Sequence, residues 1–164
     1  MASRAARRSA TALLLAALLT AACASFAKTL DARGSKVADG DTITVAARGD
    51  DVTIRLLYID APEHDQPWGR EARRGLQELV RLAPVRIDTR GKDKYGRTLG
   101  RVTGRGDNLD VNLEVVRRGL AWANARGAMR MRYEAAEAEA RSARRGLWQD
   151  TRPIAPQVWR HRKR

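Results

Sequence analysis

The spacing of apolar residues predicts extended chain in the first half of the sequence. Ile43 and Val45 alternate with threonines, and the residues from Val52 to Ile59 continue with the same two-residue period. This period is typical of β-strands, because successive side chains point to opposite faces of a sheet. Between the two segments, Gly49 to Asp51 has the composition of a hairpin turn. The pattern therefore predicts two antiparallel strands joined by a tight turn.

A helical period follows these strands. Apolar residues recur on one side of a helix of about three turns, which must end before Pro84 because the proline ring cannot continue a helix. The residues on this side are Ala72, Leu76, Leu79, Val80 and Ala83. Two further strands, Val85–Thr89 and Leu99–Thr103, flank the loop Asp93–Gly96, whose composition suits a tight turn. We therefore expect a second hairpin.

Two more helices are predicted in the last third of the chain. Asp110 can cap a helix from Val111 to about Arg118, and Gly119 can supply its left-handed stop. From Tyr133 to Leu147, apolar residues recur three and four positions apart. Strands thus precede helices, which favours an α+β fold in which a small antiparallel barrel carries helices.

The first 27 residues have the layout of an export signal. Three arginines precede an apolar run, Ala10–Ala22, which is short for a membrane span and is followed by small residues. We expect cleavage after Ala24 or Ala27 and a secreted or periplasmic protein. Cys23, the single cysteine, also stands where a bacterial lipoprotein signal carries its lipid. A lipid anchor in the envelope is therefore the alternative, and it is the one membrane contact that we expect.

Charge and size narrow the possible functions. The chain has 32 Lys and Arg against 19 Asp and Glu, for a net charge of +13, of which +10 belongs to the 137 residues after the signal. Such an excess favours polyanionic partners, although a basic surface also serves solubility. One cysteine excludes a disulfide framework or a thiolate metal site. We expect one domain, residues 28–150, and a basic tail, residues 151–164, that is disordered.

Acidic residues cluster at the ends of the first two predicted strands. Asp41 follows Asp39 in an Asp-Gly-Asp-Thr motif, in which the glycine lets the backbone bend, and Asp60 and Glu63 belong to Asp-Ala-Pro-Glu. Neighbouring strands of a hairpin would bring these carboxylates together, as oxygen ligands for a hard cation and as a base for water. Taken singly, the motifs also fit an ordinary turn and a solvated loop acid.

Two arginines add groups that suit a phosphate. Arg55 interrupts an apolar strand, where a guanidinium needs either a carboxylate or a substrate phosphate as its partner. Arg97 follows the second predicted turn, and its planar donors suit the oxygens of a phosphate in which charge develops. Lys94 and Tyr95, in the same turn, fit a solvent-facing tip of the hairpin. Carboxylates and guanidinium groups together are typical of phosphodiester hydrolysis.

In order and spacing, these motifs resemble the staphylococcal nuclease (thermonuclease) family, and the similarity extends from about Lys36 to Trp148. The resemblance implies a five-stranded antiparallel OB-fold β-barrel with three helices. It also implies calcium-dependent hydrolysis of DNA and RNA that leaves 3′-phosphates. We expect a monomer without a stable protein partner.

The resemblance also implies a role for each residue of the motifs. Ca²⁺ would be held by Asp41, Asp60 and the main-chain oxygen of Ala61. Glu63 would be the base that activates water, and Arg55 and Arg97 would face the scissile phosphate. Lys94 and Tyr95 match residues that contact the terminal phosphate of a nucleotide.

Two departures from the family pattern affect substrate binding. The segment between Glu63 and Ala72 is short compared with the long loop of the staphylococcal enzyme, and residues 123–127 lack the aromatics that stack on a base there. The main alternative is a catalytically inactive OB-fold module that binds nucleic acid. A basic envelope protein that only holds acidic polymers is a third reading. The complete set of two arginines, two aspartates and a glutamate favours the enzyme.

Overall fold

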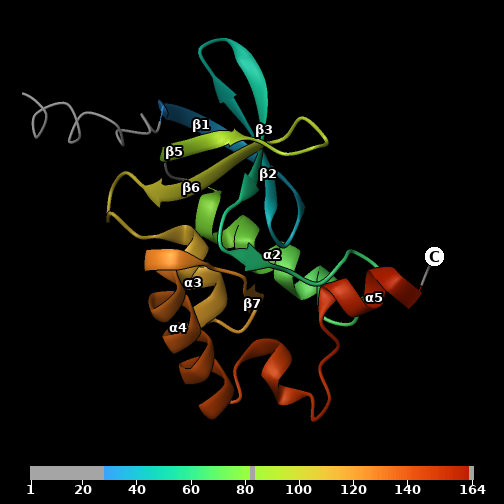
Figure 1. The fold of residues 1–164 in the computed structure, drawn as a ribbon. Coiled ribbons are helices and arrows are strands. Elements are labelled where there is room, and N and C mark those ends of the chain that lie inside the picture. Colours follow the sequence, from blue (N-terminus) through green and yellow to red (C-terminus); the bar gives the residue numbers. More distant parts are fainter. Residues whose placement is uncertain (1–27, 82–83, 163–164) are drawn as a thin grey trace, which may run out of the picture.

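Five strands form a closed barrel in the computed structural model, which describes residues 28–81 and 84–162 (Figure 1). Residues 1–27, which we expect to form an export signal and which include Cys23, lie outside the described residues, as does Ala83. Around the barrel, the strand order is β1-β2-β3-β6-β5. The strands are β1 (Lys28–Asp39), β2 (Thr42–Ala47), β3 (Asp50–Leu56), β5 (Val85–Lys92) and β6 (Thr98–Gly104). The expected barrel with helices is confirmed.

One strand pair departs from the expected antiparallel arrangement. β3 and β6 run parallel, with Ile54 opposite Thr98, whereas the other barrel pairs are antiparallel. A helix and β5 lie between β3 and β6 in the chain, so β6 starts from the same end of the barrel as β3. Both predicted hairpins, β2 with β3 and β5 with β6, are confirmed.

β1 is the strand that the apolar spacing did not predict. Its buried side chains Ala32 and Val37 are five residues apart, so they do not fit a two-residue period. The register shifts between Arg33 and Ser35 explain this spacing, because a β-bulge inserts a residue and exchanges the two faces of the strand. β1 pairs with both β2 and β5 and thereby closes the barrel.

The predicted strand from Val52 to Ile59 is interrupted. β3 ends at Leu56, and the chain turns through Tyr58, whose φ is 71°, before β4 (Ile59–Asp60) begins. β4 then pairs with β7 (Trp122–Ala123), outside the barrel. This turn directs Asp60 back towards the end of β3, where the candidate site lies.

Helices cover one end of the barrel. In Figure 1, α2 (Gly69–Val80) runs beneath the strands, and α3 (Val111–Arg117) and α4 (Arg130–Ser142) lie beside it. The prediction for α2 is confirmed, since Ala72, Leu76 and Val80 are buried against the barrel. The termini of α3 are confirmed as well: Asp110 Oδ1 accepts a hydrogen bond from the Leu113 N–H at 3.2 Å, and Gly119 has a φ of 68°.

The carboxyl-terminal third departs from the predictions in two places. α4 ends at Ser142, and Leu147 belongs to a separate 3₁₀ turn, η2 (Gly146–Gln149), after η1 (Gly127–Met129). The expected disorder of residues 151–164 is wrong for the described part, because α5 (Pro156–Arg162) is helical. The described residues therefore contain four α-helices instead of the expected three.

A buried polar residue joins the helices to the barrel. Asn112, in α3, is fully buried; its Oδ1 accepts the Val102 N–H at 2.9 Å, and its Nδ2 donates to the carbonyls of Leu57 at 2.9 Å and Gly100 at 3.1 Å. These bonds connect α3 to β6 and to the turn after β3. Asn112 therefore fixes the turn from which Asp60 emerges.

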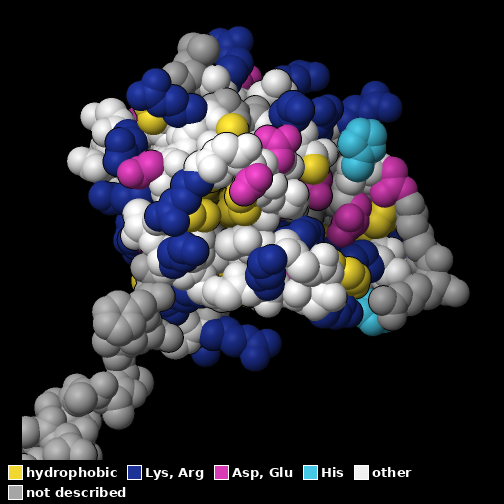
Figure 2. Space-filling view, turned by 90° about the horizontal axis from the view of Figure 1, so that it is seen from above, with side chains coloured by type: hydrophobic (Ala, Val, Ile, Leu, Met, Phe, Trp, Pro, Cys, Tyr) yellow, Lys and Arg dark blue, Asp and Glu magenta, His cyan; other side chains and the backbone are white. Residues whose placement is uncertain are grey.

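Basic side chains are prominent on one face of the molecule (Figure 2). Figure 2 shows Lys and Arg spread over the face seen from above, with acidic side chains in smaller groups among them. Within residues 28–81 and 84–162, no helix combines the length and the apolar character that crossing a membrane requires.

Candidate active site

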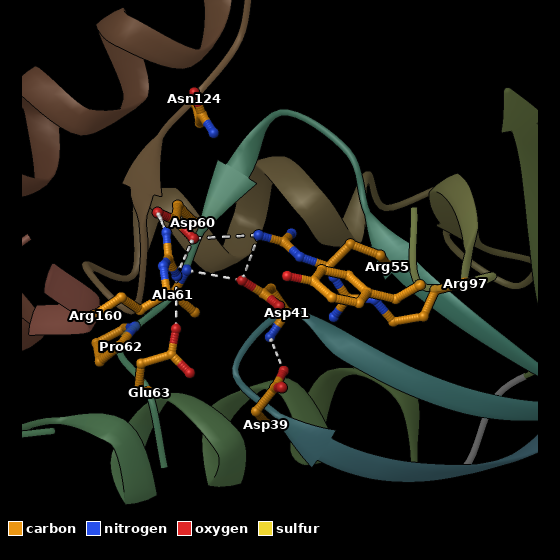
Figure 3. A pocket seen from close by; sticks show the side chains of 11 residues that line it. Asp39, Asp41, Arg55, Asp60, Ala61, Pro62, Glu63, Arg97, Asn124 and Arg160 are labelled. Atoms are coloured by element: carbon orange, nitrogen blue, oxygen red, sulfur yellow. Dashed lines mark hydrogen bonds and ion pairs between the residues drawn. The ribbon is translucent and has the colours of Figure 1, made fainter. Parts of the chain in front are cut away.

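A cavity of about 390 Å³ opens where the ends of β2, β3 and β4 meet (Figure 3). Seven of the eight predicted site residues line it, and Lys94 does not. The seven are Asp41, Arg55, Asp60, Ala61, Glu63, Tyr95 and Arg97. Asp39, Asn124 and Arg160 line it too.

The hairpin of β2 and β3 brings Asp41 beside Arg55. Thr42 lies opposite Arg55 in the register, and the Leu56 N–H donates to the Asp41 carbonyl at 2.8 Å. Arg55 Nη2 lies 2.9 Å from Asp41 Oδ2 and 3.2 Å from Asp60 Oδ1. One guanidinium therefore holds two of the three predicted calcium ligands together.

Arg55 is fixed by the backbone as well as by the aspartates. Its Nη1 donates to the carbonyls of Leu56 at 2.7 Å and Ile59 at 3.0 Å, and its side chain is 16% exposed. The sequence left either a carboxylate or a substrate phosphate as the partner of Arg55, and the structure contains the carboxylates. Nε has no partner among the described residues, so a further donor is left for a phosphate.

Asp41 is buried, and two other carboxylates, those of Asp39 and Asp60, act on it together with Arg55. The side chain accepts hydrogen bonds from the Thr42 hydroxyl at 3.1 Å and the Ala61 N–H at 2.9 Å. Burial raises the pKa of Asp41 from 3.8 to about 7; Arg55 lowers this pKa, whereas neighbouring Asp39 raises it. A cation in the cavity would stabilise the ionised carboxylate.

Gly40 is required between Asp39 and Asp41, but for a different reason than expected. A Cβ atom at Gly40 would lie 2.6 Å from the Ala61 Cβ and 2.7 Å from the Ala72 Cβ. The glycine therefore allows the turn to approach β4 and α2 closely. This close approach, and not a special backbone bend, places Asp41 against Ala61.

Glu63 lies on a short loop after β4 and faces the same cavity. Its N–H donates to Gln66 Oε1 at 3.1 Å, and its side chain is 37% exposed. Glu63 Oε1 accepts a hydrogen bond from Arg160 Nη1 at 2.6 Å. Glu63 thus lies within reach of both solvent and the aspartates, as a base for water requires.

The turn between β5 and β6 brings Arg97 to the cavity. Arg97 Nε lies 2.8 Å from Asp93 Oδ2, and Arg97 Nη1 donates to the Thr42 hydroxyl at 3.4 Å. Although burial acts in the opposite direction, hydrogen bonds from Arg97 and Tyr95 lower the pKa of Asp93. Asp93 therefore stays ionised and orients the guanidinium.

Tyr95 and Lys94 are placed differently in this turn. Tyr95 is 69% exposed and lines the cavity, and Arg97 Cζ lies 5.6 Å from the centre of its ring. Lys94 Nζ lies 5.0 Å from the same ring, but Lys94 is not part of the cavity lining. Of the two residues, Tyr95 has the geometry for direct substrate contact.

The structure adds two residues that the sequence reasoning did not assign to the site. Asn124 follows β7, and its N–H donates to the Tyr58 carbonyl at 2.7 Å. Arg160 comes from α5, in the segment expected to be disordered. The signal for this helix was present, because Pro156 suits the first position of a helix and Val158 and Trp159 are apolar residues in a basic segment.

The oxygen atoms of the site suit a hard cation. Asp41, Asp60 and Ala61 line the cavity, and carboxylate and carbonyl oxygens are the ligands that Ca²⁺ and Mg²⁺ prefer. No group of three or more His, Cys, Asp or Glu in the described part of the chain is arranged to hold a metal ion. Two carboxylates therefore need main-chain oxygen and water to complete a coordination shell. The residues fit a partly hydrated cation.

Comparison with known proteins places the chain in a family. The family model described as staphylococcal nuclease homologue matches residues 53–150. An uncharacterized endonuclease of Haemophilus influenzae is 37% identical over 155 residues, which cover 94% of this chain and 85% of the relative. An uncharacterized endonuclease of Escherichia coli O157:H7 is 41% identical over 128 residues, which cover 78% of this chain and 83% of the relative. A micrococcal nuclease of Shigella flexneri is 36% identical over 144 residues, which cover 79% of this chain and 81% of the relative.

The matched range contains most of the cavity residues. Arg55, Asp60, Glu63 and Arg97 fall within it, whereas Asp41 and Arg160 fall outside. The family model covers more than half of the chain, and the relatives align over most of their own length. The chain therefore belongs to the staphylococcal nuclease family and is an enzyme of the nuclease class.

Proposed function

We propose that this protein is an exported, calcium-dependent nuclease that hydrolyses DNA and RNA by water attack and leaves 3′-phosphates. The observation that carries the proposal is the convergence of Asp41, Asp60, Glu63, Arg55 and Arg97 on one cavity. This set can bind a cation, accept a proton and stabilise a phosphate whose negative charge grows.

Glu63 is the proposed base. It is partly exposed and lies beside Asp60 through their shared partner Arg160, so its carboxylate can accept a proton from a water that enters the cavity. Proton acceptance raises the nucleophilicity of that water towards phosphorus. No covalent enzyme intermediate is needed.

The arginines are the proposed electrostatic catalysts. Arg55 is held by two carbonyls and two carboxylates, and Arg97 is held by Asp93, so both guanidinium groups are oriented before substrate binds. Preorganised donors stabilise developing charge without reorganisation during the reaction. Calcium, when bound by Asp41, Asp60 and Ala61, would supply a Lewis acid that neutralises charge on the phosphate.

Basic residues continue from the site along one side and support a polynucleotide substrate. An adjoining cavity of about 500 Å³ shares Arg55, Arg97 and Asn124 with the site and adds Arg90 and Arg126. Contacts to backbone phosphates are independent of sequence and of the sugar. This surface supports cleavage of both DNA and RNA.

The proposed location follows from the amino-terminal sequence alone. Residues 1–27 have the layout of an export signal, and export would deliver the nuclease to the periplasm or the medium. Lipid attachment at Cys23 would retain it in the envelope. Mass spectrometry of the mature amino terminus separates the two outcomes, because the lipid adds a large mass to a chain that begins at Cys23.

An inactive nucleic-acid-binding module is the second candidate. One observation favours it: Arg160 lies against Asp60 and Glu63, the two carboxylates most needed for chemistry. If Arg160 kept this contact permanently, the protein would bind nucleic acid without cleaving it.

The decisive experiment incubates the purified protein with single-stranded DNA and with RNA, in calcium or in excess chelator. We expect cleavage in calcium and binding without cleavage in chelator. Product ends that a polymerase extends only after phosphatase treatment would identify 3′-phosphates. Asp41→Asn serves as the matched control, since it removes a proposed ligand and keeps the side-chain shape. Binding without cleavage in both buffers would leave the inactive module as the function.

A further inference from the structure

The chain after η2 returns to the site and contacts the loop that carries Glu63. In Figure 1, α5 lies beside the chain that leads into α2. Gln66, which is buried, donates from Nε2 to the Ile154 carbonyl at 2.5 Å, and Trp159 Nε1 donates to Asp65 Oδ1 at 3.3 Å. Pro156 is buried as well. Contacts on both sides of Pro156 therefore hold α5 at the cavity.

α5 places one guanidinium group on two active-site carboxylates. Arg160 Nη2 lies 2.9 Å from Asp60 Oδ2, and Arg160 Nη1 lies 3.3 Å from Asp60 Oδ1 and 2.6 Å from Glu63 Oε1. In Figure 3, Asp60 lies between the guanidinium groups of Arg55 and Arg160. The hydrogen bonds to Asp60 and then Glu63 raise the pKa of Arg160, so it stays charged.

These contacts use the same oxygens that the cation and the water need. A calcium ion lies about 2.3–2.6 Å from each ligand oxygen. A guanidinium group 2.9 Å from Asp60 Oδ2 competes with a divalent cation for that oxygen, because two positive groups that share one carboxylate repel each other. The Arg160 side chain is 45% exposed, so it has solvent into which it can move. Arg55 also contacts Asp60, but its side chain is only 16% exposed and donates to two backbone carbonyls as well, so it remains in place.

We propose that Arg160 is an exchangeable counter-ion of the active site: it binds Asp60 and Glu63 when no cation is present, and cation binding displaces it from both. The inference rests on the proposed calcium dependence. Arg160 then lowers the apparent calcium affinity, since part of the binding free energy is used to separate its ion pairs. It also keeps Glu63 from acting until the cation arrives.

Calorimetric titration of the purified protein with calcium alone tests the exchange. We expect Arg160→Ala to bind calcium about tenfold more tightly than the wild type, which corresponds to a wild-type site that Arg160 occupies about nine-tenths of the time. Arg162→Ala is the matched control, because it removes the same charge from the same helix at an exposed position without a contact to either carboxylate. Its affinity should change by less than about twofold, as expected for a screened charge.

A second measurement follows the guanidinium itself. The side-chain Nε–H signal of Arg160 should shift during the calcium titration of the wild-type protein, in proportion to the heat released. Arg160→Lys keeps a charge at the helix while losing the forked contact with Asp60 and Glu63, so its calcium affinity should fall between those of the wild type and Arg160→Ala. Circular dichroism of each variant establishes that it is folded.

The outcomes separate the two proposals. Equal calcium affinity in wild type and Arg160→Ala, with calcium bound in both, would overturn the exchange and leave calcium dependence standing. An Arg160 signal that does not move as calcium binds would overturn it as well. Absence of calcium binding in both proteins would instead overturn the calcium proposal. Loss of cleavage in Arg160→Ala with unchanged calcium affinity would make Arg160 a substrate-contacting residue and also contradict the exchange.

Discussion

Arg55 Nη2 lies 2.9 Å from Asp41 Oδ2 and, through the same nitrogen, 3.2 Å from Asp60 Oδ1. Asp41 is 6% exposed, and its carboxylate would be costly to ionise without this partner. The same guanidinium is proposed to face the scissile phosphate. Arg55 thus connects the stability of the site to its chemistry.

Arg55→Lys tests whether this arginine acts in catalysis or only in binding. A lysine is a point charge that cannot reproduce four directed contacts, so cleavage should slow about 10²- to 10³-fold. Affinity for a nucleotide in calcium should fall less than the rate does. The measurements are kcat and the nucleotide Kd of the same preparation; equal losses in both would reduce Arg55 to a binding residue.

The raised pKa of Asp41 predicts a specific dependence of stability on pH. The folded carboxyl binds its proton more tightly than the unfolded one, because its pKa is about 7 in the folded state and 3.8 in the unfolded reference. Between these values the folded state holds more protons, so the unfolding free energy of the cation-free protein should fall as pH rises from about 4 to about 7 and then level off. The slope is at most about 1.4 kcal/mol per pH unit.

Urea unfolding in chelator at a series of pH values measures this decline. Asp41→Asn carries no ionisable group, and the decline should largely disappear in this variant. The unfolding free energy of the wild type could instead rise from pH 4 to pH 7 by the same amount as that of Asp41→Asn. This result would show that burial does not raise the pKa of Asp41.

Glu63→Gln isolates the proposed base. The amide keeps the shape of the side chain and an oxygen for Arg160, but it cannot accept a proton from water. Turnover in calcium should fall about 10²- to 10⁴-fold while calcium and nucleotide binding largely persist. The readouts are single-turnover cleavage and calorimetric affinity; a turnover equal to that of the wild type would assign the base to another group.

Asn112→Ala tests the connection between α3 and the turn that carries Asp60. Deletion of the amide leaves the Val102 N–H and the Leu57 carbonyl without their buried partner, and the free energy of unfolding should fall by about 2–4 kcal/mol. Asn124→Ala is the control, because the Asn124 side chain makes no hydrogen bond to another described residue. Urea unfolding of both variants gives the comparison, and similar losses would contradict the role of Asn112.

Much of the site was predictable because local patterns determined it. The alternation around Ile43 and Val52 indicated a hairpin, and a hairpin suffices to bring Asp41 beside Arg55. The composition of the turn before Arg97 likewise indicated a hairpin, whereas the placement of Arg97 at the site came from the family resemblance. Chemistry at these positions follows from residue type, since carboxylates and guanidinium groups have few other reasons to gather in one cavity.

The remaining features depend on contacts between distant segments. The bulge in β1 hides its alternation, and the left-handed Tyr58 divides a segment whose residues all suit a strand. α5 is too short to form a stable helix in isolation, and its position depends on buried Gln66, 88 residues away from Ile154 in the sequence. The basic composition of residues 151–164 therefore suggested a solvated tail. In the structure, packing against the rest of the protein makes Pro156–Arg162 helical.

The position of α5 has a practical consequence for work with this protein. Any sequence that follows Arg162, an affinity tag included, starts from a helix that places Arg160 against Asp60 and Glu63. A polyhistidine tag at that end would add metal-binding imidazoles close to the very site whose metal requirement is to be measured. Preparations tagged at opposite ends should therefore be compared before any metal dependence is assigned to the enzyme.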